Sequence, residues 1–153
     1  MTAKKEQIVF SRPMGGMAGE SLTKQIASHL SIGEEEAEKL KVTYPENTLP
    51  NDRKSDLAAV VQNFFDRGAI EIQRSLDAFL AQFPGHDIQT LHFTGGASQM
   101  SGLQKFIADT LMVTVREIDP FRSVDGSKFD PETLHREGGL YGVATGLAFP
   151  KKI

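Results

Sequence analysis

The sequence predicts an α/β fold in which helices outnumber strands. Two short β-type runs, residues 88–94 and 112–118, flank residues 99–110, where apolar side chains recur at helical spacing. Because parallel strands need such a crossover helix between them, the two runs are expected to pair in parallel. A glycine turn, Thr94-Gly95-Gly96-Ala97-Ser98, joins the first run to the helix. Turns of this kind allow backbone N–H groups to approach an anionic or nucleotide ligand.

The N-terminal part predicts a third strand and two helices. Residues 7–12 form a short β-type run, and a glycine-rich loop follows it. Residues 20–30 predict an amphipathic helix with an apolar face made of Leu22, Ile26, Ala27 and Leu30. Residues 34–42 predict a second helix, whose acidic first turn suits the positive end of the helix dipole.

The longest helix is predicted in the middle of the chain. Residues 43–54 contain two prolines and are expected to form a loop, after which Ser55 or Asp56 is expected to cap a helix over residues 57–83. Gly68 lies inside this helix at a cost of about 1 kcal/mol relative to alanine, which a close neighbour or a ligand would explain. The small residues of 138–149 predict a final helix that packs tightly against a sheet.

Composition limits the classes of function. The 153 residues suit one domain, and a net charge of −3 gives no general case for nucleic acid or an anionic membrane as a partner. The sequence has no cysteine, which excludes disulfides and thiolate metal sites and fits a reducing cytoplasm. No apolar run approaches the ~20 residues of a membrane span, and the polar N-terminus lacks the apolar stretch of a signal peptide.

Six short motifs occur in a specific order. They are Leu22-Thr23, Ala37-Glu38-Lys39-Leu40-Lys41, Glu71-Ile72-Gln73-Arg74-Ser75-Leu76, Thr94-Gly95-Gly96-Ala97-Ser98, Gly102-Leu103 and Ala144-Thr145-Gly146-Leu147-Ala148. This order resembles the second half of the actin-like ATPase superfamily. Within the superfamily it is most similar to the PilM group of type IV pilus assembly proteins, relatives of the division protein FtsA.

The resemblance implies a fold and a domain organisation. The chain is expected to be a partial actin-like ATPase (ribonuclease H-like) domain with a small, partly parallel sheet and several packed helices. Residues 1–153 would form a single domain. Residues 7–32 and 86–150 would belong to the large subdomain, and residues 33–85 to a mainly helical small subdomain.

The resemblance also implies a nucleotide site. Gly95, Gly96, Ala97 and Ser98 match the adenosine motif, whose turn lies against the base and the ribose. Glu38 and Lys41 match positions that reach the adenine and ribose edge. Glu71, Arg74 and Ser75 are similar to helix residues that approach the sugar or the base. Carboxylates accept hydrogen bonds from ribose hydroxyls, and a lysine or arginine stem can cover a base.

The sequence departs from the family where phosphates would bind. The two phosphate-binding hairpins of the family are absent, and the Gly-Gly-x-x-Leu-Thr motif appears as Ala18-Gly19-Glu20-Ser21-Leu22-Thr23. The chain therefore looks like a C-terminal fragment or truncated form, with ATP binding weak or absent and Mg²⁺ bound only together with the missing half. Phosphoryl transfer needs charge stabilisation at the phosphates, so no hydrolysis is expected from this chain on its own.

The expected function is that of a cytoplasmic scaffold module of type IV pilus assembly or related secretion machinery. Its expected partners are pilus-assembly membrane proteins, which would bring it to the inner membrane, or its own N-terminal half. A homo-oligomer could form through the exposed sheet edge at residues 7–12. No nucleic acid is expected as a partner.

Three other functions are compatible with parts of the sequence. One is half of a split ATPase of the actin or sugar-kinase class. Another is a protein-interaction domain that binds no nucleotide. A hydrolase built on Ser98 or His92 is disfavoured, because nothing in the sequence resembles a nucleophile elbow.

Overall fold

The computed structural model describes residues 8–46, 48–122, 130 and 138–148. It has the predicted α/β character, with helices in the majority and one parallel strand pair. The elements in chain order, with η marking 3₁₀ helices, are α1 (Gly19–Leu30), α2 (Glu34–Val42), α3 (Asn51–Gln82), β1 (Thr90–Phe93), η1 (Gly96–Gln99), α4 (Leu103–Leu111), β2 (Thr114–Glu117), η2 (Gly138–Tyr141) and α6 (Gly142–Ala148).

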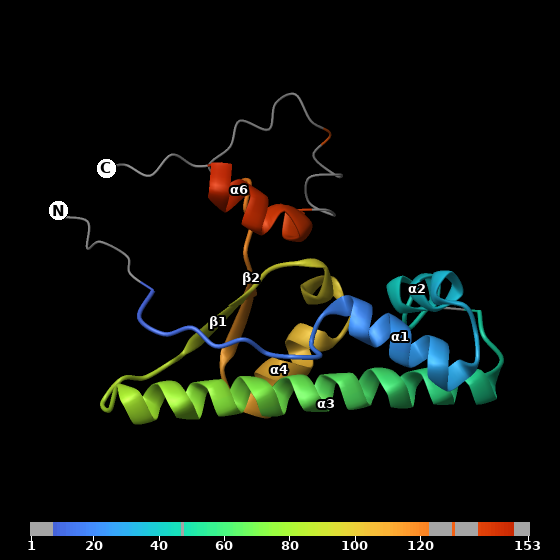
Figure 1. Ribbon diagram of the computed structural model, residues 1–153, viewed down its shortest axis with the longest axis horizontal. Helices are drawn as coiled ribbons and strands as arrows, with labels where there is room; N and C mark the ends of the chain where they lie inside the picture. Colours follow the sequence, from blue (N-terminus) through green and yellow to red (C-terminus); the bar gives the residue numbers. More distant parts are fainter. Residues whose placement is uncertain (1–7, 47, 123–129, 131–137, 149–153) are drawn as a thin grey trace.

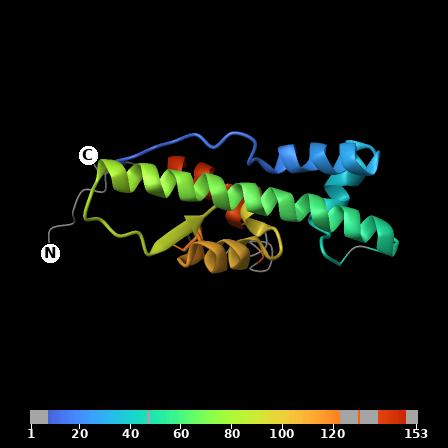
Figure 2. The same ribbon diagram turned by 90° about the horizontal axis from the view of Figure 1, so that it is seen from below.

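The long helix α3 runs the length of the molecule, and the other elements are arranged along it (Figure 1). α1 and α2 lie beside its N-terminal half, and β1, β2 and α4 lie nearer to its C-terminal half. The view turned by 90° places the irregular N-terminal segment and α1 on one side of α3, and β1 and α4 on the other (Figure 2). α3 itself carries Glu71, Arg74 and Ser75, and the other predicted site residues lie on elements arranged along it.

The core forms where α1 and α4 pack against α3. The predicted apolar face of α1 is buried, which confirms its amphipathic assignment. The largest fully buried side chains are Phe64, Leu22, Ile26, Leu57, Ile107 and Val61. Gly68 has the close neighbour that the sequence suggested, since a Cβ at this position would lie 2.9 Å from Met17 Cε.

The two strands form the predicted parallel pair. Thr90 lies opposite Thr114, and Phe93 lies opposite Glu117. α4 lies between the two strands in the sequence and packs against β2, as the crossover between parallel strands requires. The described residues therefore contain a two-stranded sheet in place of the expected three strands.

The strand predicted at residues 7–12 is wrong for the part that the structure describes, residues 8–12. These residues have no regular secondary structure, and the side chain of Ile8 is 91% exposed. The segment is attached to α3 through side chains: Phe10 packs edge-on against Phe79, with ring centroids 6.0 Å apart. A β-type sequence without a neighbouring strand cannot form ladder hydrogen bonds, and this explains the difference.

Two helix boundaries also differ from the prediction. α3 begins six residues earlier than expected, at Asn51, so neither Ser55 nor Asp56 caps it. Pro50 occupies the N-cap, and its carbonyl oxygen accepts a 2.9 Å hydrogen bond from the Lys54 N–H. The predicted C-terminal helix is divided into η2 and α6, and its last position, Phe149, lies outside the described residues.

Candidate functional site

The turn after β1 is held in one conformation by its own hydrogen bonds. Gly95 has a φ of +95°, a conformation that side chains disfavour. The hydroxyl of the buried Ser98 donates a 2.7 Å hydrogen bond to the carbonyl oxygen of Gly95. The Ser98 N–H donates to the same oxygen at 3.1 Å. The predicted turn is therefore rigid, and η1 with a break at Gly102 separates it from α4.

A second glycine motif, in η2 and the first residue of α6, packs against this turn. The Gly95 N–H donates a 2.8 Å hydrogen bond to the carbonyl oxygen of Gly139, and Thr94 Oγ1 lies 3.2 Å from the same oxygen. A Cβ at Gly142 would lie 2.1 Å from Thr94 Oγ1. The close backbone approach predicted for these glycines is present, and it is made to the turn after β1.

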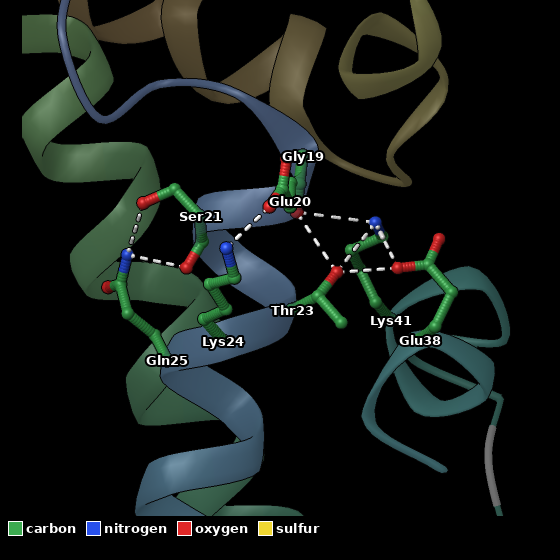
Figure 3. Close-up of polar contacts among 8 residues, drawn as sticks. All are labelled: Gly19, Glu20, Ser21, Thr23, Lys24, Gln25, Glu38 and Lys41. Carbon is green, nitrogen blue, oxygen red and sulfur yellow. Dashed lines mark hydrogen bonds and ion pairs between the residues drawn. The ribbon is translucent and has the colours of Figure 1, made fainter. Parts of the chain in front are cut away.

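Glu38 and Lys41 form a compact polar cluster with the start of α1 (Figure 3). Lys41 Nζ donates to Glu38 Oε2 at 2.6 Å, to Thr23 Oγ1 at 3.0 Å and to the Gly19 carbonyl oxygen at 3.3 Å. The Thr23 hydroxyl lies 2.5 Å from Glu38 Oε2 and 3.0 Å from the Gly19 carbonyl oxygen. We call these four residues the Lys41 cluster. It joins α2 to the first turn of α1.

Burial and charge make the Lys41 cluster stable. The Lys41 side chain is only 13% exposed. The hydrogen bonds that Lys41 and Thr23 donate to the Glu38 carboxylate hold its pKa below the ordinary value of 4.5. Partial burial of the carboxylate raises the pKa, but by less than these hydrogen bonds lower it. Among the described residues, Glu38 Oε1 has no hydrogen-bond partner, and it points away from Thr23 (Figure 3). One carboxylate oxygen therefore remains as an acceptor.

Glu71, Arg74 and Ser75 lie together on α3, and Arg12 joins them from the N-terminal segment. Arg12 Nη2 lies 3.3 Å from Glu71 Oε2, and Arg12 Nη1 donates to Ser75 Oγ at 3.3 Å. Arg74 Nη1 contacts the other Glu71 oxygen at 2.6 Å. Sequence reasoning missed Arg12, because the segment that carries it was expected to be a strand. Two guanidinium groups thus share one carboxylate, which gives this surface a local positive charge.

Two clefts border the predicted site residues. One, of about 490 Å³, lies between residues 10–17, α3 and β1, and it is mainly apolar. Ser75, Ala97 and Ser98 contribute to its wall. The other, of about 610 Å³, lies between the end of α2 and the segment from η1 to α4.

The structure therefore brings the predicted residues together only in part. Ser98 lines both clefts, and Ser75 shares one of them with the turn. Glu38 and Lys41 line neither cleft, because their side chains are engaged with α1. Thr23, which anchors that engagement, was recognised in the sequence only as part of a motif. Its place in the sequence next to Leu22, on the predicted apolar face of α1, is a signal that could have identified it, and the structure shows that it is buried.

Two further properties concern metal and membrane. Within residues 8–46, 48–122, 130 and 138–148, no group of three histidine, cysteine or carboxylate side chains is arranged to hold a metal ion. Over the same residues, no helix combines the length and the apolarity needed to cross a bilayer.

The parallel strand pair, the glycine turn and the packed helices correspond to part of an actin-like domain, and this defines the class of protein. The family model described as type IV pilus assembly protein PilM matches residues 2–152. The chain belongs to this family.

A solved structure titled "PilM-PilN type IV pilus biogenesis complex" is similar, with 27% sequence identity and a TM-score of 0.72. The match covers 86% of this chain and 36% of that chain, so the present chain corresponds to about a third of its neighbour. No curated protein sequence matches significantly.

Proposed function

We propose that this chain is a scaffold module of type IV pilus assembly that keeps the adenosine side of an ATP site and does not hydrolyse ATP by itself. The observation that carries the proposal is the ordered turn at Gly95–Ser98, whose last residue, Ser98, lines a cleft together with Val42 at the end of α2. The cleft volume of about 610 Å³ falls in the range of ligand pockets, roughly 300–1,000 Å³.

The residues fit the adenosine half of a nucleotide. Gly96 in the turn Gly95–Gly96–Ala97–Ser98 is exposed, and the turn would lie against the base and the ribose. Glu38 does not line this cleft itself, but its Oε1 would be the acceptor for a ribose hydroxyl that reaches past the end of α2. Ser75 lines the other cleft together with Ala97 and Ser98, so Glu71, Arg74 and Ser75 would reach the sugar only from that side of the turn. When bound, ATP would supply the phosphates and Mg²⁺ would supply charge neutralisation, which this arrangement of residues does not itself provide.

The family supports an inference about partner and location. The similar solved structure is a complex of PilM with PilN. We infer that a pilus-assembly membrane protein of this kind binds the present chain and holds it at the cytoplasmic side of the inner membrane. Purified PilN tests this inference by interferometry: saturable binding supports it, and absence of binding in the presence and absence of ATP contradicts it.

Calorimetric titration tests the nucleotide part of the proposal. We expect ATP to bind with a Kd tighter than about 1 mM, which corresponds to about −4.1 kcal/mol. The Lys41→Met variant should bind more weakly than wild type, since it releases α2 from α1. Lys39→Met is the matched control, because Lys39 pairs with Glu35 on the exposed face of the same helix. Equal affinity in both variants would count against a role for the Lys41 cluster, and phosphate release would contradict the non-catalytic claim.

A second candidate function is protein interaction through an open sheet edge. β1 pairs with β2 along one edge, and its other edge pairs with no strand in the described part of the chain. The mainly apolar cleft of about 490 Å³ lies along β1. An extended segment of another chain, of the N-terminal half of the protein or of a second copy could add there as a strand.

Light scattering tests the second candidate. A concentration-dependent dimer that a proline at Leu91 abolishes would favour strand pairing between copies. A monomer at all concentrations would contradict the homo-oligomer.

A further inference from the structure

One edge of β1 carries backbone groups that bond to no other strand. The carbonyl oxygens of Gln89 and Phe93 each accept a 2.9 Å hydrogen bond, from an N–H at the start of β2 and from one just after its end. Backbone groups of successive residues in a strand point in opposite directions, so Thr90 and His92 direct theirs to the other edge. Within the part of the chain that the structure describes, no strand pairs with that edge.

This free edge lacks the features that usually prevent strand pairing. Exposed edges are commonly protected by proline, by lysine and other charged side chains, or by a bulge. Residues 90–93, Thr-Leu-His-Phe, contain no proline, lysine, arginine, aspartate or glutamate. β1 pairs with β2 in an unbroken register from Thr90 to Phe93, so no bulge twists the strand away. The edge is therefore able to accept another strand.

The free edge also borders the mainly apolar cleft of about 490 Å³. Four consecutive residues, 91–94, line this cleft. Successive side chains of a strand point to opposite faces, so a cleft that is lined by consecutive residues follows the edge of the strand and not one face. Leu91 and Phe93 pack against the core, and His92 is exposed. A strand added at this edge would cover apolar surface as well as backbone groups.

The sequence of β1 suits a second copy of the same strand. A two-fold axis places one surface against the same surface of the second copy. An antiparallel pair centred on Leu91 sets Thr90 of each copy opposite His92 of the other, so the outward-facing backbone groups meet. A shift by one residue would set them against residues that already bond to β2. Centring the pair on His92 would place two imidazoles opposite each other, which is unfavourable when they are charged.

We propose that two copies of this chain associate through the free edges of β1, in an antiparallel pair centred on Leu91. This inference rests on the second candidate function and names its partner and its register. The strands then form one continuous sheet with two strands from each copy. The two Leu91 residues form a pair without mutual hydrogen bonds, in which side chains lie closest, and they join the apolar clefts of the two copies.

Disulfide cross-linking tests the register. The sequence contains no cysteine, so each single variant carries one thiol. A mixture of Thr90→Cys and His92→Cys should form a disulfide-linked heterodimer in oxidised glutathione, because Cα atoms of such a pair lie about 5.5 Å apart, within disulfide range. The matched control mixture is Thr90→Cys with Arg116→Cys. It moves the second thiol to the exposed neighbour of His92 on β2, and it should not cross-link.

Sedimentation of a proline variant provides the second arm. His92→Pro removes an N–H that points to the free edge, and proline is tolerated at such edge positions because the ladder to β2 does not use that N–H. The variant should weaken the dimer by about tenfold or more, since it removes hydrogen bonds between the copies. His92→Thr is the control, because it keeps the N–H and a side chain that suits a strand. This arm does not depend on the folding of the cysteine variants.

The outcomes separate this inference from the second candidate function. A concentration-dependent dimer that Leu91→Pro abolishes, but that gives no cross-link in the Thr90→Cys and His92→Cys mixture, overturns the register while strand pairing stands. A wild type that stays monomeric overturns both the register and the homo-oligomer. A dimer that His92→Pro leaves unchanged, or equal cross-linking in the Arg116→Cys control, would place the contact elsewhere and would overturn the proposal.

Discussion

The backbone N–H of Gly95 donates a 2.8 Å hydrogen bond to the carbonyl oxygen of Gly139, and this joins the turn after β1 to η2. Because of this hydrogen bond, the conformation of the turn depends on a segment more than 40 residues further along the chain. The turn is also the part of the chain that we propose as a ligand surface. Thr94 contacts the same carbonyl oxygen, and Gly142 packs on Thr94. The C-terminal glycine motif thus stabilises the turn.

Gly142→Ala should destabilise the protein. The added Cβ would lie 2.1 Å from Thr94 Oγ1 and 3.3 Å from Thr94 Cβ, so the turn or α6 must move. Overpacking of this kind costs about 1–3 kcal/mol. Gly146→Ala is the control, because nothing lies within 4 Å of a Cβ there and alanine favours the helix by about 1 kcal/mol. Urea unfolding should give a lower midpoint for Gly142→Ala than for Gly146→Ala, and the reverse order would contradict the packing described.

Lys41→Met should lower the free energy of unfolding by about 1–2 kcal/mol. The variant removes three hydrogen bonds from a mostly buried ammonium group, among them one to a carboxylate. Lys39→Met should change the free energy of unfolding by less than about 0.5 kcal/mol, because its ion pair is exposed. Urea denaturation of both variants makes the comparison. Equal effects would show that the Lys41 cluster does not attach α2 to α1.

Stability should fall in acid partly through Glu38. Lys41 and Thr23 hold the pKa of this carboxyl below its ordinary value in the folded protein. A group with a depressed folded-state pKa stabilises the fold above its unfolded pKa, and this contribution is lost as pH falls through the folded-state value. The Glu38→Gln variant should therefore lose less stability than wild type between about pH 7 and about pH 3. Glu36→Gln, on the same helix, controls for the loss of a charge, and parallel pH profiles for all three proteins would refute the assignment.

Arg12→Ala should release the N-terminal segment from α3. Its guanidinium bonds Glu71 and Ser75, and Phe10 lies close by against Phe79. We expect faster chymotrypsin cleavage after Phe10, with a change of less than about 1 kcal/mol in the free energy of unfolding because the ion pair is partly exposed. Arg74→Ala is the control, since it removes a contact to Glu71 that lies within α3. Unchanged cleavage in Arg12→Ala would mean that this ion pair does not hold the segment.

Local pattern was sufficient to predict most of the fold. The apolar spacing of α1 and α3 and the β–helix–β order around α4 predicted these elements because each one buries a continuous face. The strand predicted at residues 7–12 failed because strand formation depends on a partner strand, which local sequence does not encode. The predicted first residue of α3 was wrong because the N-cap is Pro50, which has no capping side chain that the sequence could reveal.

The site was less predictable than the fold. The glycine turn could be recognised because four small residues, 95–98, stand between the apolar run of the predicted strand and the helical spacing that follows. The contact partners of the site residues could not be predicted from the sequence. Arg12 contacts Glu71, and Thr23 contacts Glu38, only after distant segments pack together.

The central claim is that this chain offers an adenosine site without a phosphate site, and calorimetry of adenosine beside ATP with Mg²⁺ tests it most directly. The account predicts that both ligands bind, with dissociation constants within about threefold of each other, because the phosphates gain little from the residues described. ATP binding more than about tenfold tighter than adenosine would contradict the claim by revealing a phosphate site. No heat from either ligand at concentrations of several times about 1 mM would contradict it by removing the adenosine site.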